Sequence, residues 1–470
     1  MSRICFFKGT FRISLALITI FFSGCFNPPR NWDEPWCSVP QKYKPDEKLL
    51  SQRPPPDSTM GTKRFPIDLE TTLRLISKNN LDIALARQGI HSAYAKVLLA
   101  DVKFIPNINP VYRFWRHEGF TQGTNGDFVD VDKQNTLLAM GVSVKWPLGD
   151  AIYSRLSALK QYDVSNAGLD IVTQETLLNG AYSYFELLKQ DRRIAISETA
   201  VKTSQKSVGE LEASVKAGRG FQGDLFRAKA QLSHIQIELS RSLEDFKLAS
   251  IKLASLLSLE QNIELYPADT DVVLLNMVEE KDVDKQILMA IENRPEITSI
   301  KKQVESDKFD HDSATIGPWI PELQIDTSFG KFGPVLGDLD RQNTFQILLG
   351  WKIGQGGFLD NGRQELADSR VRVSEIKFVR TVQKITEEVK SANTTAASRI
   401  EQLNFAKQEV KDAEDSLRLF QERQAAGTGM PFELLQAEDA LTRAKLDYLY
   451  AASEYNKAQY NLFTRIGLKK

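Results

Sequence analysis

The sequence predicts a mixed α and β fold in which one helix, strand, strand, helix, helix unit occurs twice. Short motifs of the first half return in the same order in the second half, and long stretches of helical periodicity flank shorter stretches that alternate at period two. With 42% hydrophobic and 26% charged residues among 470, the chain has enough apolar material for large buried interfaces.

The repeated motifs define two copies of the unit. The pairs are Asn80-Leu-Asp-Ile with Arg294-Pro-Glu-Ile, Phe104-Ile-Pro with Trp319-Ile-Pro, Trp146-Pro-Leu with Trp351-Lys-Ile, and Ala217-Gly-Arg-Gly with Ala426-Gly-Thr-Gly. We therefore predict a first structural repeat at residues 66–260 and a second at 284–468. An inter-repeat linker without a clean period, residues 261–283, joins them.

The strongest helical signal follows each Gly-rich turn, where apolar residues recur every seven positions and smaller residues lie three positions later. The first copy has Leu225, Leu232, Leu239, Phe246 and Leu253 with Ala228, Ile235, Ser242, Ala249 and Leu256, and the second has Leu434, Leu441, Tyr448, Tyr455 and Leu462 with Ala437, Ala444, Ala451, Ala458 and Arg465. These are the a and d positions of a coiled coil. The pattern also predicts helices at 66–103, 155–216, 284–316 and 363–425.

The intervening segments read as strands with one apolar face. Met140, Val142 and Val144 alternate with small or polar residues, and the second copy repeats the alternation from Phe345 to Ile353. This pattern fits transmembrane β-barrel strands, and a half-buried sheet in a soluble protein is the alternative. An export signal and two polar connecting loops, 117–134 and 333–342, favour the barrel. Four strands cannot close a membrane barrel, which needs about eight, so the chain must oligomerise.

The first residues have the layout of a signal peptide. Three basic residues precede an apolar run at 13–22, which is shorter than the roughly 20 residues that a membrane-spanning helix needs. We therefore assign residues 1–24 to a signal peptide. The small residues directly before Cys25 resemble a bacterial lipobox, which predicts that Cys25 becomes the lipidated first residue and incorporates palmitate. An ordinary secretory signal is the alternative.

Residues 25–65 are predicted to form the lipid anchor and a Pro-rich tether, because eight of the 18 prolines lie between 26 and 65. Cys5 leaves with the signal peptide, so only Cys25 and Cys37 remain. A bridge between these two cysteines is the alternative to lipidation.

Composition argues against several functional classes. The 60 basic and 61 acidic residues leave a formal charge of -1, and no segment concentrates the basic residues as a nucleic-acid surface would. The four histidines are far apart in sequence, so we predict no metal site. The segment from Gly357 to Gln364 approaches a phosphate-binding loop but has Arg363 in place of the lysine. We predict a strand-to-helix turn there, no cofactor and no enzyme activity.

Taken together, these features resemble the outer-membrane efflux protein family, the TolC-like channels, over roughly residues 65–468. The resemblance rests on the duplicated unit, the Phe104-Ile-Pro and Trp319-Ile-Pro segments, Trp351-Lys-Ile followed by Asn361-Gly-Arg, and the Ala-rich coil after Gly427. It implies a homotrimer with a twelve-stranded transmembrane β-barrel in the outer membrane, continued by a long periplasmic α-helical coiled-coil barrel. Many members are lipoproteins, and Phe26 after the lipidated cysteine favours the outer membrane over the inner one.

The resemblance implies the function of an outer-membrane exit channel. Such a channel passively conducts substrates from the periplasm to the outside for a tripartite efflux pump or a type I secretion system. Its implied partners are a periplasmic adaptor protein, an inner-membrane transporter and outer-membrane lipid. The alternative is a periplasmic coiled-coil structural lipoprotein that never forms a pore.

The two Gly-rich turns, 217–224 and 426–433, are the best candidate sites, because several glycines allow the positive φ angles of a tight helical hairpin. The resemblance implies that these tips face the adaptor, and the tip residues are Gly218, Gly220, Asp224, Gly427 and Gly429. A turn without further function is the alternative.

The acidic residues after each turn have two predicted roles. Asp224 and Glu433 occupy equivalent positions, where a carboxylate in the first helical turn favours the helix dipole. Family channels carry acidic rings near the periplasmic aperture, and Glu433 matches one such position. Gln436 stands where a second ring would have its carboxylate, although Glu438 and Asp439 are close in sequence.

Overall fold

The computed structural model describes residues 63–468 except 106, 219, 260–262 and 427–429. The predicted signal peptide, Cys25 and most of the tether lie outside the described residues. The described chain divides into two compact units, each boundary falling within a helix. The first unit contains residues 89–165 and 300–377, and the second contains residues 63–88, 166–299 and 378–468.

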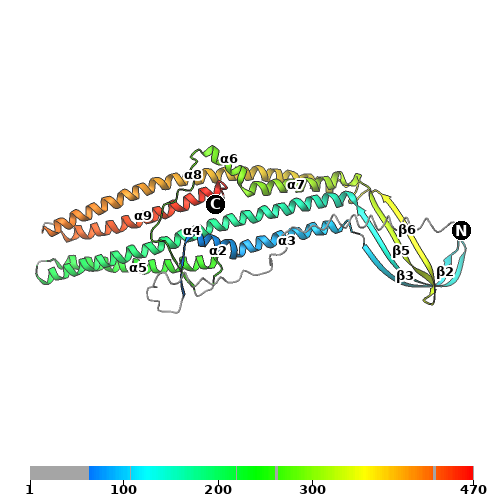
Figure 1. Ribbon diagram of the computed structural model, residues 1–470, viewed down its shortest axis with the longest axis horizontal. Helices are drawn as coiled ribbons and strands as arrows, with labels where there is room; N and C mark the ends of the chain where they lie inside the picture. Colours follow the sequence, from blue (N-terminus) through cyan, green and yellow to red (C-terminus); the bar gives the residue numbers. More distant parts are fainter. Residues whose placement is uncertain (1–62, 106, 219, 260–262, 427–429, 469–470) are drawn as a thin grey trace, which may run out of the picture. The chain divides into compact units, whose positions relative to one another are not determined.

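The same order of elements occurs twice (Figure 1). The first set is α2 (Leu69–Asn79), α3 (Leu81–Val102), β2 (Asn107–Gln122), β3 (Phe128–Pro147), α4 (Leu148–Lys216) and α5 (Gln222–Leu256). The second set is α6 (Val283–Asn293), α7 (Pro295–Thr315), η1 (Gly317–Trp319), β5 (Glu322–Val335), β6 (Asp338–Gly350), α8 (Asn361–Ala425) and α9 (Pro431–Arg465). Two short strands, β1 (Lys63–Ile67) and β4 (Ile263–Pro267), pair in parallel.

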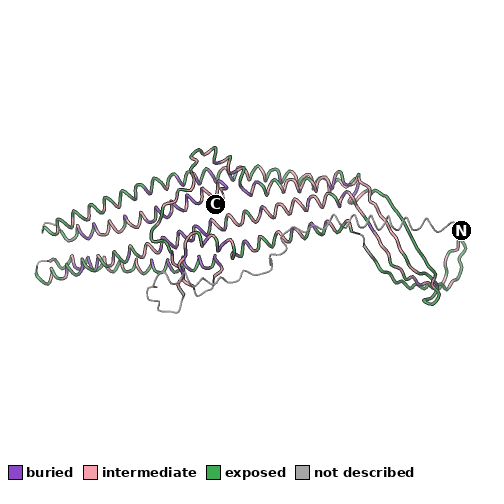
Figure 2. The backbone as a smooth tube through the Cα atoms, in the orientation of Figure 1, coloured by how far each residue is buried: buried purple, intermediate pink, exposed green. Residues whose placement is uncertain are grey.

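In the first unit, four strands form one antiparallel sheet in the order β2-β3-β5-β6 (Figure 1). The register places Met140 opposite Phe329 and Ile325 opposite Ile347, so the apolar positions of different strands share one face. Nearly all of β6 is exposed (Figure 2). Strands β2 and β6 are the two edges, each with one side that pairs with no described strand.

The polar loops predicted at 117–134 and 333–342 are largely strand. Strand β2 continues to Gln122 and β3 begins at Phe128, with a turn in which Gly126 has φ +88°. The predicted loop residues pair across the strands, and Arg116 forms an ion pair with Asp132 at 3.0 Å. We predicted loops because these residues are polar. Cross-strand pairing of the polar side chains instead stabilises strands in this part of the hairpin.

The helices predicted at 66–103 and 284–316 are each interrupted at the start of a repeated motif. Residues 63–67 are strand, and α2 ends before Asn80, whose side chain accepts hydrogen bonds from the backbone N–H groups of Asp82 (2.8 Å) and Ile83 (3.3 Å). This N-cap begins α3. In the second copy, Pro295 disfavours helical geometry at Arg294, where α6 ends and after which α7 begins.

The largest apolar core lies in the second unit. Helix α4 contributes Tyr184 and Leu187, which pack with Ile76 of α2 and Leu253 of α5. Leu265 of β4 is also fully buried in this cluster. The segment 261–283, which we predict to link the two repeats, thus includes strand β4, and β4 contributes Leu265 to this core.

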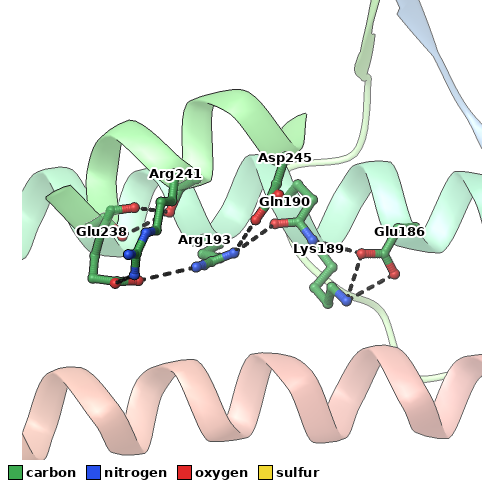
Figure 3. A network of polar contacts seen from close by, with 9 residues as sticks. Glu186, Lys189, Gln190, Arg193, Glu238, Arg241 and Asp245 are labelled. Carbon is green, nitrogen blue, oxygen red and sulfur yellow. Dashed lines mark hydrogen bonds and ion pairs between the residues drawn. The ribbon is translucent and has the colours of Figure 1, made fainter. Parts of the chain in front are cut away.

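The predicted heptads determine how the long helices pack. The four alanines of the small line in α9, Ala437, Ala444, Ala451 and Ala458, are all buried. Between α4 and α5, polar groups form a network (Figure 3). In it, Arg193 contacts Asp245 at 2.7 Å and Glu238 at 3.4 Å.

No helix in the described part of the chain is both long and apolar enough to cross a membrane.

The strand-to-helix turn predicted near residue 360 is present. The Asp360 carboxylate accepts hydrogen bonds from the backbone N–H groups of Gly356 (2.8 Å) and Arg363 (3.1 Å), which caps α8. The Arg363 guanidinium forms an ion pair with Asp150 at 2.8 Å. The Arg363 side chain is thus paired with a carboxylate of the same chain.

Candidate functional site

The first Gly-rich turn connects α4 to α5 through a tight helix end. Gly218 has φ +71°, and its N–H donates to the carbonyl of Val215 at 2.9 Å. The N–H of Gly220 donates to the carbonyl of Ser214 at 3.1 Å. A Cβ on Gly220 would lie 2.9 Å from the backbone nitrogen of Val215. Both glycines are therefore required by backbone geometry.

Asp224 lies in the first turn of α5 and is half-buried. The residue before the helix, Phe221, forms no side-chain capping bond. A carboxylate close to this otherwise uncapped helix start interacts favourably with the helix dipole. Asp224 is thus placed for the capping role that its sequence position predicts.

The second turn leads from α8, which ends at Ala425, to α9. Gly427 and Gly429 fall in the gap at 427–429, outside the described residues. Glu433 lies in the first turn of α9, and one of its carboxylate oxygens is 3.4 Å from the Arg423 guanidinium of α8. The predicted ring residue thus has a cationic neighbour across its own turn. The sequence contains one signal for this pair, because a basic residue in the last turn of α8 precedes an acidic residue in the first turn of α9.

Apolar contacts hold the second hairpin against the first. Leu435 of α9 belongs to a buried cluster with Val208 and Leu211 of α4 and with Leu225 of α5. Nearer the turn, the Arg227 guanidinium lies 4.7 Å from the centre of the Phe432 ring. This is a cation–π distance.

Two hydrogen bonds add polar links between the same hairpins. The Ser207 hydroxyl of α4 donates to the Glu438 carboxylate of α9, and the Gln231 amide of α5 donates to Asp439 at 3.0 Å. Burial raises the pKa of Glu438, the hydrogen bond from Ser207 opposes this, and the Glu210 charge adds to it. The carboxylates beside Gln436 therefore have partners within the chain, which sequence spacing did not predict.

A half-open cavity of about 680 Å³ lies between these helices in the second unit. Its lining combines apolar side chains with the acidic pair Glu438 and Asp439, and it includes Arg192, Ile235, Leu417, Leu441 and Tyr448. In the described part of the chain, no group of three acidic, His or Cys side chains is arranged to hold a metal ion.

Comparison with known proteins shows a family match over most of the chain. Residues 72–258 and 287–468 match the family described as "Outer membrane efflux protein". The chain is also similar to Nodulation protein T of Rhizobium leguminosarum bv. viciae, with 21% identity over 473 residues that cover 96% of this chain and 92% of that protein.

Solved structures share the fold. The outer-membrane channel OprN aligns with a TM-score of 0.75 and 17% identity, covering 85% of this chain and 90% of OprN. The outer membrane protein VceC from Vibrio cholerae aligns with a TM-score of 0.74 and 17% identity, covering 85% of this chain and 96% of VceC.

Proposed function

Because the chain belongs to the outer membrane efflux protein family, we propose that it is the outer-membrane exit channel of a tripartite efflux pump or a type I secretion system. It conducts substrates passively from the periplasm to the outside, and an inner-membrane transporter supplies the energy. The four-stranded sheet with two edges carries this proposal.

The sheet is too small to form a pore alone. An apolar face towards lipid and edge strands with unsatisfied backbone groups are tolerated in a membrane only when the sheet closes into a barrel. Since a membrane barrel needs about eight strands, each chain must share its sheet with other copies. Two copies would reach this minimum, and the family resemblance favours three copies and twelve strands.

The strand directions allow this closure. In the antiparallel order β2-β3-β5-β6, the two edge strands run in opposite directions. Strand β6 of one copy would therefore pair antiparallel with β2 of the next, and the same contact would repeat around a rotation axis.

The α4–α5 and α8–α9 hairpins would extend the channel into the periplasm as a helical barrel. Their two turns, with Gly218, Gly220 and Asp224 on one and Gly427 and Gly429 on the other, would contact the adaptor protein. Glu433 would line the aperture. Cys25 would anchor the chain by its lipid, while the barrel provides most of the membrane attachment.

Disulfide trapping across the edge strands tests the barrel. In a background with Cys37 replaced by Ser, one cysteine is placed on β2 at Val111 or Arg113 and one on β6 at Gln346 or Leu348. Oxidation in outer-membrane vesicles is expected to produce a covalent ladder that ends at three chains for at least one combination.

The single-cysteine variants are the matched controls and should give no three-chain product. A ladder that stops at two chains would contradict the trimer but not the shared barrel. Only single chains for every combination would favour the alternative of a structural lipoprotein without a pore.

A further inference from the structure

Two basic side chains lie directly opposite each other on the apolar face of the sheet. The register pairs Lys331 of β5 with Arg341 of β6. Two residues further along each strand, Phe329 faces Asn343, and the next pair with the same orientation joins Thr327 and Phe345. Because side chains alternate between faces, Lys331 and Arg341 share the face of these apolar residues.

This basic pair has no acidic partner within the part of the chain that the structure describes. Arg116, on the same face, contrasts with it because it forms ion pairs with both Glu118 and Asp132. Asp340 is next to Arg341 in sequence and is thus directed to the opposite face. When the Asn343 side-chain amide is oriented so that its oxygen and its nitrogen both form hydrogen bonds, the oxygen accepts from Arg341 Nε at 3.2 Å. The side chains of Lys331 and Arg341 are both exposed.

Like charges directly opposite each other destabilise an antiparallel pair of strands. An anion bound between the two cations would relieve this repulsion. A lysine ammonium and an arginine guanidinium together supply several donors to the oxygens of a phosphate group. Exposed apolar side chains adjoin the pair, with Leu138 opposite Lys331 on β3, and Phe329 and Phe345 further along β5 and β6. A free phosphate has no apolar part that could contact these side chains, whereas a lipid places its acyl chains against them.

We propose that Lys331 and Arg341 bind the phosphate of a phosphorylated glycolipid in the outer leaflet, with the acyl chains against the apolar face. The inference rests on the proposed function, in which this face contacts lipid and the hairpin ends lie towards the outside. The pair lies near the β5–β6 turn, at the end of the strands away from the helices, where lipid head groups would be.

The test compares the Lys331→Gln/Arg341→Gln double variant with wild type. Lipopolysaccharide is titrated into each protein in neutral detergent, and the lipid phosphorus retained after purification is measured. Since each basic residue near a charged lipid surface contributes about 1 kcal/mol, the double variant should bind about 30-fold more weakly. Its phosphorus content should fall in parallel.

The matched control is the Arg113→Gln/Lys133→Gln variant, which removes two positive charges from the opposite face of the same sheet. It should bind lipopolysaccharide within about twofold of wild type, apart from a small general charge effect. Both double variants should fold, because the exposed side chains support no core. Circular dichroism and the particle mass verify this.

The outcomes separate the site from the proposed function. Unchanged lipopolysaccharide affinity in the Lys331/Arg341 variant, with wild type inserting into bilayers, would overturn the site alone. Displacement of the lipid by inorganic phosphate in molar excess would overturn the lipid as the source of the phosphate. Failure of wild type to insert into bilayers of phosphatidylcholine and phosphatidylglycerol would overturn the proposed function and the lipid site with it.

Discussion

The Ser207 hydroxyl on α4 donates hydrogen bonds to both carboxylate oxygens of Glu438 on α9, at 3.0 and 3.1 Å. The two residues belong to different helical hairpins, 231 positions apart in sequence. The link lies beside the buried cluster around Leu435 and helps to hold the turn-bearing ends of the hairpins together within one chain.

Glu438→Gln should make the association of the two hairpins stronger at neutral pH. Burial raises the pKa of Glu438, so the folded state binds a proton more tightly than the unfolded state. The contribution of Glu438 to the free energy of unfolding is therefore fully present below its unfolded pKa of about 4.5. This contribution decreases as pH rises through the folded pKa. Glutamine mimics the protonated acid, so hydrogen exchange at 204–211 and 435–442 should be slower than in wild type at pH 7 and equal at pH 4. Slower exchange in wild type at pH 7 would contradict this.

Glu186→Gln should have the opposite pH dependence. Burial favours a raised pKa for Glu186, but hydrogen bonds from Lys189, Lys457 and Gln190 outweigh it and lower the pKa to about 2. The contribution to stability is therefore present above pH 4.5 and is lost as pH falls towards 2. After discounting for solvent exposure, the variant should lose about 1–2 kcal/mol of unfolding free energy at pH 7. Acid-unfolding curves that are identical for the two proteins between pH 4.5 and 2 would count against this role.

Arg294→Met should destabilise the junction of α6, α7 and α8. The buried Arg294 guanidinium bridges the carboxylates of Glu296 and Glu388. Removing it leaves two partly buried acids without this cation, which should cost about 3 kcal/mol in urea unfolding.

Two further variants test the bridging role. Arg294→Lys should recover only part of the loss, because an ammonium lacks the planar guanidinium fork. Adding Glu296→Gln and Glu388→Gln to Arg294→Met should restore most of it. A triple variant as unstable as Arg294→Met would show that lost packing, rather than unpaired charge, causes the effect.

Arg423→Gln should increase cation-over-anion selectivity, and Glu433→Gln should lower it and weaken block by multivalent cations. Three copies of Glu433 around an axis would repel each other by about 0.7 kcal/mol per pair at ~6 Å in water, and they would attract cations. Arg423, 3.4 Å from this carboxylate, offsets part of the charge. Reversal potentials in asymmetric salt measure the selectivity.

Asp224→Asn is the matched control, because it removes one carboxylate at the equivalent position of the other turn. It should leave selectivity unchanged and affect mainly the stability of the α4–α5 hairpin. Unchanged selectivity in the Glu433 variant would exclude its ring as the filter and direct attention to Glu438 or Asp439.

Periodicity made much of the fold predictable from sequence. The heptads of α9 identified its buried alanines, and period-two alternation identified the apolar face of the sheet. Family membership, inferred from the order of the repeated motifs, is confirmed.

Contacts between distant segments were not predictable. The break at Asn80 depends on a local cap, and its side chain also donates to the Leu256 carbonyl at 3.1 Å, far along the chain. The pairing of Ser207 with Glu438 depends on how two hairpins pack, which no local pattern encodes. The partner of Glu433 across the second turn was missed although Arg423 lies only ten residues away, because spacing across a turn does not define which side chains meet.

In the proposed function, several copies of this chain form one continuous pore through the outer membrane. Planar-bilayer recording of the purified protein tests for this pore. Particles that contain three chains should give discrete conductance steps. A folded particle of one chain that inserts into the bilayer and produces no conductance would contradict it.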